Sequence, residues 1–216
     1  QRSTLEYELP DFASIKEDHY KEAFYEGTKE QLAEIFALAT ELGIGVTFRS
    51  GGTSLSGQAT SDGFLVDTRK NFRGIKVGNQ GEQVSVSPGA TVRAVNTSLA
   101  RFKRKLGPDP ASEVACTIGG VVANNSSGMC CGTEQNSYRT IASLVLVLPN
   151  GLVIDTGASN ADEILLQKSP GIHAGLIALR DRIRSNPDSV TLIQRIFSIK
   201  NTMGYGINSF LDFDSP

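Results

Sequence analysis

A loop rich in glycine and hydroxyl side chains is the first part of the sequence whose residue types could do chemistry. Residues 48 to 59 read FRSGGTSLSGQA. Gly51, Gly52 and Gly57 leave neighbouring backbone N–H groups uncovered, and consecutive N–H groups in a turn form a nest that binds anions. The serine and threonine hydroxyls add further donors. We therefore expect this loop to hold one phosphate group or two.

The loop matches neither of the common nucleotide motifs. A P-loop needs a lysine after its last glycine, and Gln58 stands there instead. A Rossmann fingerprint needs GxGxxG at the start of a helix, which this loop does not offer. Because Gly and Ser are also common in loops that bind nothing, this loop alone fits a ligand-free surface turn equally well.

A second donor-rich segment favours a ligand. TIGGVVANN, residues 117 to 125, puts a glycine pair at a predicted helix start, where free N–H groups and the helix dipole attract negative charge. NNSSG, residues 124 to 128, adds amides and hydroxyls. Two separated loops of this kind suit a long, polar, phosphate-bearing cofactor.

Other catalytic arrangements find little support in the sequence. Two histidines, His19 and His173, argue against a histidine-based metal site and against a Ser-His-Asp triad. Cys116, Cys130 and Cys131 cannot form an even disulfide framework, which indicates a reducing compartment. The adjacent Cys130 and Cys131 could take a redox or covalent role, although inert buried cysteine is commoner. We nominate no catalytic residue and no metal ligand.

Composition and charge exclude several partners. The 216 residues are 39% hydrophobic and 20% charged, with a net charge of -2. Without a basic excess to neutralise phosphates, we expect no nucleic-acid partner. No apolar run approaches the roughly 20 residues that cross a bilayer, so we expect no transmembrane segment. The prediction is a soluble, cytoplasmic protein.

Short strands and helices must position these loops. Thr28 and Gln31 predict a capping box at the start of a helix that Gly43 ends. Residues 46 to 48 and 64 to 68 read as strands on either side of the first loop. Residues 75 to 77 and 84 to 87 predict a hairpin, and a helix is expected from about 90 to 102.

The second half of the chain continues this mixture. Residues 106 to 140 form a long, Gly/Ser/Asn-rich and partly helical stretch, and such long loops are usually functional. Residues 143 to 157 predict a hairpin around Pro149-Asn150-Gly151. Two amphipathic helices are expected at about 172 to 185 and 188 to 197. Strands, hairpins and helices in this order indicate the α+β class.

Three stretches carry a resemblance to a known family: RSGGTSLSGQA, GPDPASEVACTIGGVVANNSSG and KNTMGYGIN. Together they resemble the PCMH-type FAD-binding domain of the FAD-linked oxidases, in the vanillyl-alcohol oxidase superfamily. The likeness is to the D-lactate dehydrogenase and glycolate oxidase branch, especially to proteins that join this flavin domain to an iron–sulfur domain. These motifs span residues 46 to 206.

The resemblance implies a fold and a set of FAD contacts. It implies two α/β subdomains with FAD between them, at 28–89 and 90–216, after an N-terminal extension of uncertain role at 1–27. The implied pyrophosphate-loop residues are Ser50, Gly51, Gly52, Thr53, Ser54, Gly57 and Gln58. Those implied along the ribityl and pyrophosphate region are Pro108, Asp109, Thr117, Gly119 and Gly120. Those implied near the flavin ring are Asn125, Ser127 and Gly128.

The resemblance also implies an activity. The whole enzyme would oxidise a small 2-hydroxy acid, with hydride passing to flavin N5 and electrons passing on to an iron–sulfur domain or a quinone. An iron–sulfur cluster and a peripheral position at the inner membrane would belong to a full-length protein. Because the first loop has Ser50 and Thr53 where some relatives carry a histidine bonded to the flavin, we expect dissociable FAD.

One departure from the family pattern, one residue of open role and one competing interpretation accompany this expectation. The chain stops before a GSEGT-type segment and a substrate-binding cap, so we expect a fragment that is inactive alone and leave its retention of FAD open. Arg49 could pair with a phosphate or with a carboxylate. A non-redox nucleotide-binding module, or a ligand-free structural fragment, would use the same loops.

Overall fold

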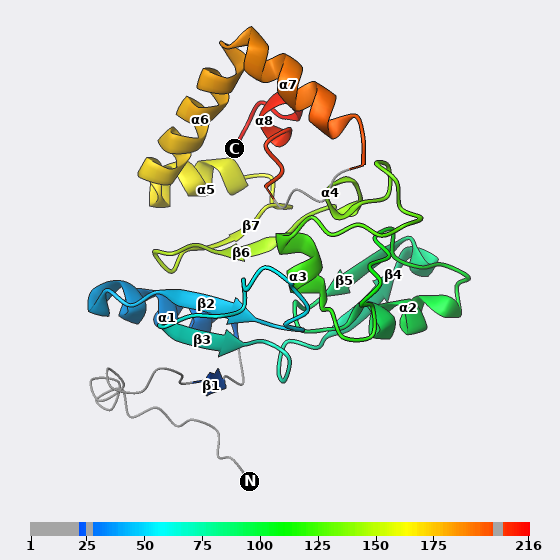
Figure 1. The fold of residues 1–216 in the computed structure, drawn as a ribbon. Coiled ribbons are helices and arrows are strands. Elements are labelled where there is room, and N and C mark those ends of the chain that lie inside the picture. The colour runs from blue at the N-terminus through cyan, green and yellow to red at the C-terminus, as the bar shows by residue number, and fades with distance from the viewer. Residues whose placement is uncertain (1–21, 25–27, 201–204) are drawn as a thin grey trace.

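A parallel sheet of three short strands carries the first glycine loop. The computed structural model describes residues 22–24, 28–200 and 205–216 (Figure 1). The sheet has the order β1 (Glu22–Phe24), β3 (Phe64–Asp67), β2 (Val46–Arg49), with both pairings parallel. All four residues of β3 are buried, as expected for a central strand covered on both faces. The first glycine loop begins where β2 ends.

The N-terminal part of the sheet differs from the sequence prediction. Strands at 46–48 and 64–68 were expected and are confirmed. The strand at 22–24 was not, because it lies in the segment interpreted as an extension of uncertain role. Its pairing with β3 makes these three residues part of the sheet. The rest of the segment, 1–21 and 25–27, lies outside the described residues.

Helix α1 (Lys29–Leu42) begins and ends as the sequence predicts. The Thr28 hydroxyl accepts from the Gln31 amide at 3.3 Å, and the Gln31 side chain accepts from the Thr28 amide at 2.9 Å. Gly43 ends the helix with φ of 65°, a conformation that glycine adopts without strain. Ile35 and Ala39 form its buried face.

A hairpin and a helix form the core beneath the second glycine segment. β4 (Ile75–Gly78) and β5 (Gln83–Val86) pair antiparallel around a 3₁₀ turn at Asn79–Gly81. Helix α2 (Val92–Ala100) packs on this hairpin through Val95 and Leu99. A neighbouring cluster joins Val92 to Cys116 and Val121, so the core of α2 reaches α3 (Ile118–Ala123).

The remaining elements lie beyond α3. They are α4 (Ser137–Thr140), the hairpin β6 (Val145–Val147) and β7 (Val153–Asp155), and helices α5 (Ala161–Lys168), α6 (Pro170–Arg184), α7 (Pro187–Phe197) and α8 (Ser209–Asp212). In Figure 1 the last four helices lie above the β6–β7 hairpin. The predicted hairpin and the two long helices are confirmed, with α6 starting at a proline, which suits the first helical turn. The α+β class is confirmed as well.

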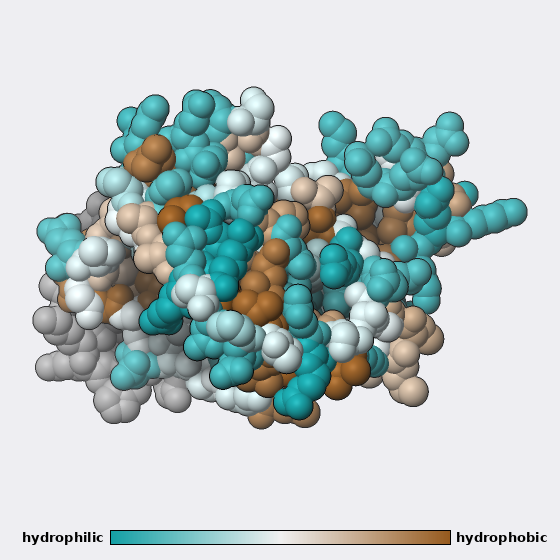
Figure 2. Space-filling view, turned by 90° about the horizontal axis from the view of Figure 1, so that it is seen from above, coloured by the Kyte–Doolittle hydropathy of each residue, from teal (hydrophilic) through white to brown (hydrophobic). Residues whose placement is uncertain are grey.

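The surface over these last helices is mostly polar. Seen from above, hydrophilic residues predominate and hydrophobic ones occur in scattered patches (Figure 2). Within the described ranges, no helix combines the length and the apolar character that a membrane crossing requires.

Candidate functional site

The first glycine turn presents a row of free backbone donors. Gly52 and Gly57 have φ of 62° and 72°, in the left-handed region that strongly favours glycine. Among the residues that the structure describes, the amides of residues 51 to 55 have no hydrogen-bond acceptor. Adjacent unpaired N–H groups of this kind can bind an anion.

The first turn lies directly against the segment that leads into α3. A Cβ atom on Gly51 would stand 2.3 Å from the Ala115 carbonyl oxygen and 2.9 Å from Cys116 Cα. Those distances are far below van der Waals contact, so only glycine permits this approach. The two glycine segments, 67 positions apart at Ser50 and Thr117, therefore meet in space.

Three hydroxyl groups join the two segments. Thr117 Oγ1 donates to Ser50 Oγ at 2.5 Å, and Thr68 Oγ1 donates to the same atom at 2.9 Å. Thr117 is 2% exposed and Thr68 is 6% exposed. Thr117, one of the residues expected at the site, thus lies beside the first turn, whereas Thr68 was not expected there.

The start of α3 offers fewer donors than its glycine pair suggests. The Ile118 amide donates to the Ala90 carbonyl at 2.9 Å, and the Gly119 amide donates to the Pro88 carbonyl at 2.8 Å. A Cβ on Gly119 would lie 2.7 Å from the Pro88 side chain, so this glycine serves close packing. Within the described part of the chain, the Gly120 amide has no acceptor and faces an exposed surface.

The NNSSG turn is fixed by buried polar groups. Asn125 has φ of 44° and is 8% exposed, and its Oδ1 accepts from the Tyr138 amide at 3.0 Å. The buried Ser137 hydroxyl donates to the Ser126 carbonyl at 2.9 Å and lies 3.2 Å from the Val121 carbonyl. Ser127 is half-buried beside this network.

Asp109 holds the end of the NNSSG turn rather than standing free. Its carboxylate accepts from the amides of Cys130 at 3.0 Å and Cys131 at 3.2 Å. Burial alone would raise the pKa of Asp109, but these hydrogen bonds outweigh it and lower the pKa. A Cβ on Gly128 would lie 1.9 Å from the Asp109 carbonyl oxygen. Asp109, after the buried Pro108, thus positions the turn.

The cysteines show no arrangement for covalent chemistry. All three are free thiols, with Cys116 and Cys131 buried and Cys130 exposed. Burial raises the pKa of the Cys116 thiol, which disfavours the reactive thiolate. The Cys131 sulfur accepts from the Gly128 amide at 3.2 Å. These contacts favour packing roles for Cys116 and Cys131.

Arg49 is the cation closest in sequence to the first turn. Its Nε atom lies 3.4 Å from the position that a Cβ on Gly52 would take. No carboxylate among the described residues forms an ion pair with it. The charge of Arg49 nevertheless acts on the Asp67 carboxylate, whose pKa it helps to lower, so pairing with a phosphate and pairing with a carboxylate both stay open.

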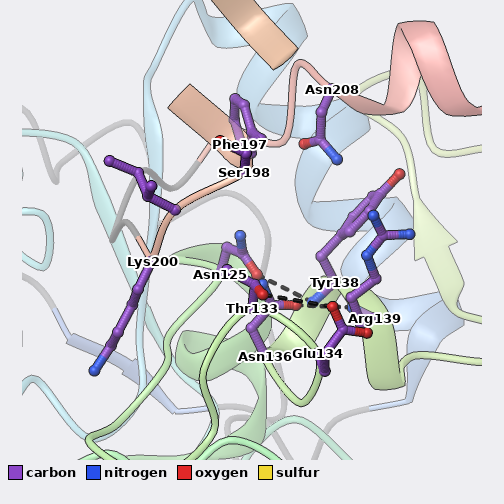
Figure 3. A pocket seen from close by; sticks show the side chains of 11 residues that line it. Asn125, Thr133, Glu134, Asn136, Tyr138, Arg139, Phe197, Ser198, Lys200 and Asn208 are labelled. Carbon is purple, nitrogen blue, oxygen red and sulfur yellow. Dashed lines mark hydrogen bonds between the residues drawn. The ribbon is translucent and has the colours of Figure 1, made fainter. Parts of the chain in front are cut away.

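A polar pocket of about 190 Å³ adjoins the NNSSG turn (Figure 3). Asn125, Tyr138 and Asn208 line it, together with Arg139 and Lys200. The Tyr138 hydroxyl donates to Asp212 at 2.8 Å, and burial, that bond and the Asp212 charge raise the pKa of the phenol. Asn208 Nδ2 also donates to Asp212, whereas its buried Oδ1 has no partner among the residues that the structure describes.

Sequence reasoning missed part of this pocket. Asn208 ends the KNTMGYGIN stretch, so that motif was its one available signal. Residues 201–204 of the same stretch lie outside the described residues. Asp212 carries no motif and was not expected.

Comparisons with known proteins agree with this geometry. Residues 23–157 match a family described as FAD binding domain. Glycolate oxidase subunit GlcD of Escherichia coli (strain K12) is 34% identical over 135 residues, which cover 62% of this chain and 27% of that protein. The D-lactate dehydrogenase of Archaeoglobus fulgidus is 32% identical over 130 residues, 59% of this chain and 29% of that protein.

Solved structures show the same fold. The 6-hydroxy-D-nicotine oxidase of Arthrobacter nicotinovorans superposes with a TM-score of 0.56 at 20% identity, covering 73% of this chain and 35% of the oxidase. The chain thus spans roughly a quarter to a third of the lengths of these three proteins. Since the family match extends from β1 to just beyond β7 and includes both glycine segments, the chain belongs to the FAD-binding domain family of the FAD-linked oxidoreductases.

Proposed function

We propose that the protein is the FAD-binding part of a flavin-dependent dehydrogenase that oxidises a small 2-hydroxy acid of the D-lactate type. The family match supports FAD, and relatives named glycolate oxidase, D-lactate dehydrogenase and D-2-hydroxyglutarate dehydrogenase support the substrate class. In the whole protein, electrons would continue to an iron–sulfur domain or a quinone. The free thiols support a reducing, cytoplasmic location.

The meeting of the two glycine segments carries this proposal. At that contact the Ser50 hydroxyl bonds Thr117 and Gly51 lies against Ala115, and the free amides of residues 51 to 55 follow directly in the chain. Arg49 adds a positive charge beside Gly52. Hydrogen bonds from amides and a guanidinium are the donors that a diphosphate requires. The diphosphate of FAD is therefore proposed to bind at this contact.

The remaining parts of FAD would extend from that contact. We propose three sets of contacts. The diphosphate side would be held by Ser50, Gly51, Gly52, Thr53, Ser54, Gly57 and Gln58. The ribityl and diphosphate region would be bordered by Pro108, Asp109, Thr117, Gly119 and Gly120, and the flavin ring would lie near Asn125, Ser127 and Gly128. Because their polar groups are already paired, Asp109 would act by holding the NNSSG turn through its carboxylate, and Gly119 would act through close packing.

The division of work between cofactor and protein follows from chemistry. Bound FAD supplies the hydride-accepting group, which no amino-acid side chain provides. The chain's own residues bind the diphosphate and orient the cofactor. With Thr53 and Ser50 in place of a histidine, the loop has no imidazole to bond the flavin, so we propose non-covalent FAD.

Spectroscopy tests this proposal. Protein purified with added FAD should show flavin absorption bands shifted from those of free FAD, and acid precipitation should release all yellow colour. A titration with ADP should displace the flavin. Binding of ADP with no binding of FAD would overturn the proposal and favour a non-redox nucleotide-binding module.

A further inference from the structure

We propose that Thr68 is a positioning residue that turns the Ser50 hydroxyl into a donor for a diphosphate oxygen. The inference rests on the proposed function, since it concerns how the same contact binds its anion. Thr68 belongs to neither glycine segment. It follows β3, on the buried side of the first turn.

The backbone of Thr68 is held rigidly. Its amide donates to the Arg49 carbonyl at 3.0 Å, which ties it to the end of β2. Its carbonyl accepts from the Phe72 amide at 3.4 Å, and a Cβ on Gly89 would lie 2.0 Å from that oxygen. The backbone that carries the Thr68 hydroxyl is therefore fixed by contacts that do not involve Ser50.

Each of the two threonine hydroxyls around Ser50 has Ser50 Oγ as its one hydrogen-bond partner among the described residues, so each can donate its proton only to that atom. Thr68 is 6% exposed and Thr117 is 2% exposed, and no second acceptor for either hydroxyl lies among the described residues. Thr117 precedes α3 at the position where a threonine usually accepts from the helix, yet it makes no such bond. Its hydroxyl is directed to Ser50 instead.

Counting hydrogens gives the direction of the Ser50 proton. A serine hydroxyl has one proton and two acceptor lone pairs. The donations from Thr68 and Thr117 occupy both lone pairs. The proton must then point away from the two threonines, and no acceptor for it lies among the described residues.

This arrangement makes the contact selective for an anion. With both lone pairs occupied, Ser50 Oγ can donate to a ligand oxygen but cannot accept from a ligand hydroxyl or amine. Removing the Thr68 hydroxyl frees one lone pair and lets the Ser50 proton turn inward. The diphosphate then loses a preoriented donor.

Substitution of Thr68 tests the inference. In Thr68→Val, which keeps the side-chain shape, FAD and ADP should each bind about 10-fold more weakly, the order expected for losing one hydrogen bond to a charged group. Thr68→Ser should restore the affinity. Thr97→Val is the matched control and should leave affinity unchanged, because the Thr97 hydroxyl donates to the Arg93 carbonyl on the exposed face of α2.

A double-substitution cycle separates positioning from general damage. In a Ser50→Ala background, Thr68→Val should cause no further loss of FAD affinity, because Thr68 acts through Ser50. Equal losses in both backgrounds, or unchanged FAD affinity in Thr68→Val, would overturn the inference while wild-type binding kept the proposed function intact. If Thr68→Val fails to fold by circular dichroism, Thr68→Ala replaces it in the same cycle. Wild-type protein that binds neither FAD nor ADP would refute the proposed function itself.

Discussion

At the scale of single residues, Gly51 governs whether the two glycine segments can touch. Gly51→Ala would put a methyl group 2.3 Å from the Ala115 carbonyl oxygen, so the turn must move away. We expect the free energy of unfolding to fall by about 1–3 kcal/mol, the usual cost of overpacking. FAD affinity should fall at least about 10-fold as the turn amides shift. Urea unfolding and flavin titration measure the two effects.

The same substitution in α6 provides the control. Gly175 has no atom within 4 Å of an added Cβ and lies inside the helix. Gly175→Ala should therefore raise the free energy of unfolding by about 0.5–1 kcal/mol and leave FAD affinity unchanged. If Gly51→Ala behaved in the same way, the close contact at Ala115 would not be needed.

Asp109 gives a residue-scale prediction about pH. Its pKa is lowered in the folded protein, because the hydrogen bonds donated by the backbone amides of Cys130 and Cys131 outweigh the effect of burial. A carboxyl group whose pKa is lower in the folded state stabilises the fold at every pH above its unfolded-state pKa, which is near 3.9. That stabilisation is lost as the pH falls through the folded-state pKa. Asp109→Asn should therefore lower the urea midpoint at pH 7, and the difference should shrink toward pH 3.

The comparison at two pH values is the check on that explanation. A difference that stayed constant between pH 7 and pH 3 would mean that the charge of Asp109 contributes nothing. Asp181→Asn is a suitable reference, since the Asp181 carboxylate accepts from the neighbouring Arg180 and bonds no amide of the NNSSG turn.

At the scale of elements, one hydroxyl group links α3 to α4. The Ser137 side chain, 2% exposed, reaches the carbonyls of Val121 and Ser126. Ser137→Ala leaves buried carbonyls with one donor fewer, which should cost about 1–3 kcal/mol of unfolding free energy. Thermal unfolding measures the loss. Ser185→Ala, whose hydroxyl bonds the Arg182 carbonyl at an exposed helix end, should cost less than about 0.5 kcal/mol.

Elements with strong local signals could be predicted from the sequence. The capping box at Thr28, the left-handed Gly43 and the turn at Gly151 are all present as expected. The sequence signals for β1, α5 and α8 are weak, because segments of three to eight residues contain too few repeats of the hydrophobic pattern to distinguish helix from strand. For β1, partner choice also depends on a strand about forty positions away.

At the scale of the whole molecule, the glycine segments and their meeting could be anticipated, but the groups beneath them could not. Ser50, Gly51 and Thr117 were expected at one site. Thr68 was not, because a threonine after a buried strand has no sequence signature. Asp109 was expected at the site, but its hydrogen bonds to the amides of Cys130 and Cys131 could not be predicted, because they join positions 21 and 22 residues apart that only the fold brings together.

Ligand binding should raise the stability of the whole chain. A ligand that binds the folded state alone, at a concentration 100 times its Kd, adds about 2.7 kcal/mol. For a protein of this size that corresponds to a rise in Tm of roughly 5–10 °C. Differential scanning fluorimetry with FAD measures the shift, and riboflavin at the same concentration should give a smaller one because it lacks the diphosphate. Equal shifts with both ligands would contradict binding through the glycine turns.

The hydrogen bond between Ser50 and Thr117 closes a chain loop of 67 positions. Contacts between positions far apart in the sequence form late in folding, because closing the intervening loop costs entropy before the contact can stabilise the chain. Refolding should therefore restore helical circular dichroism before it restores quenching of flavin fluorescence. Flavin binding would then report the last stage of folding, and a folding intermediate trapped before that stage would contain helix but no bound flavin.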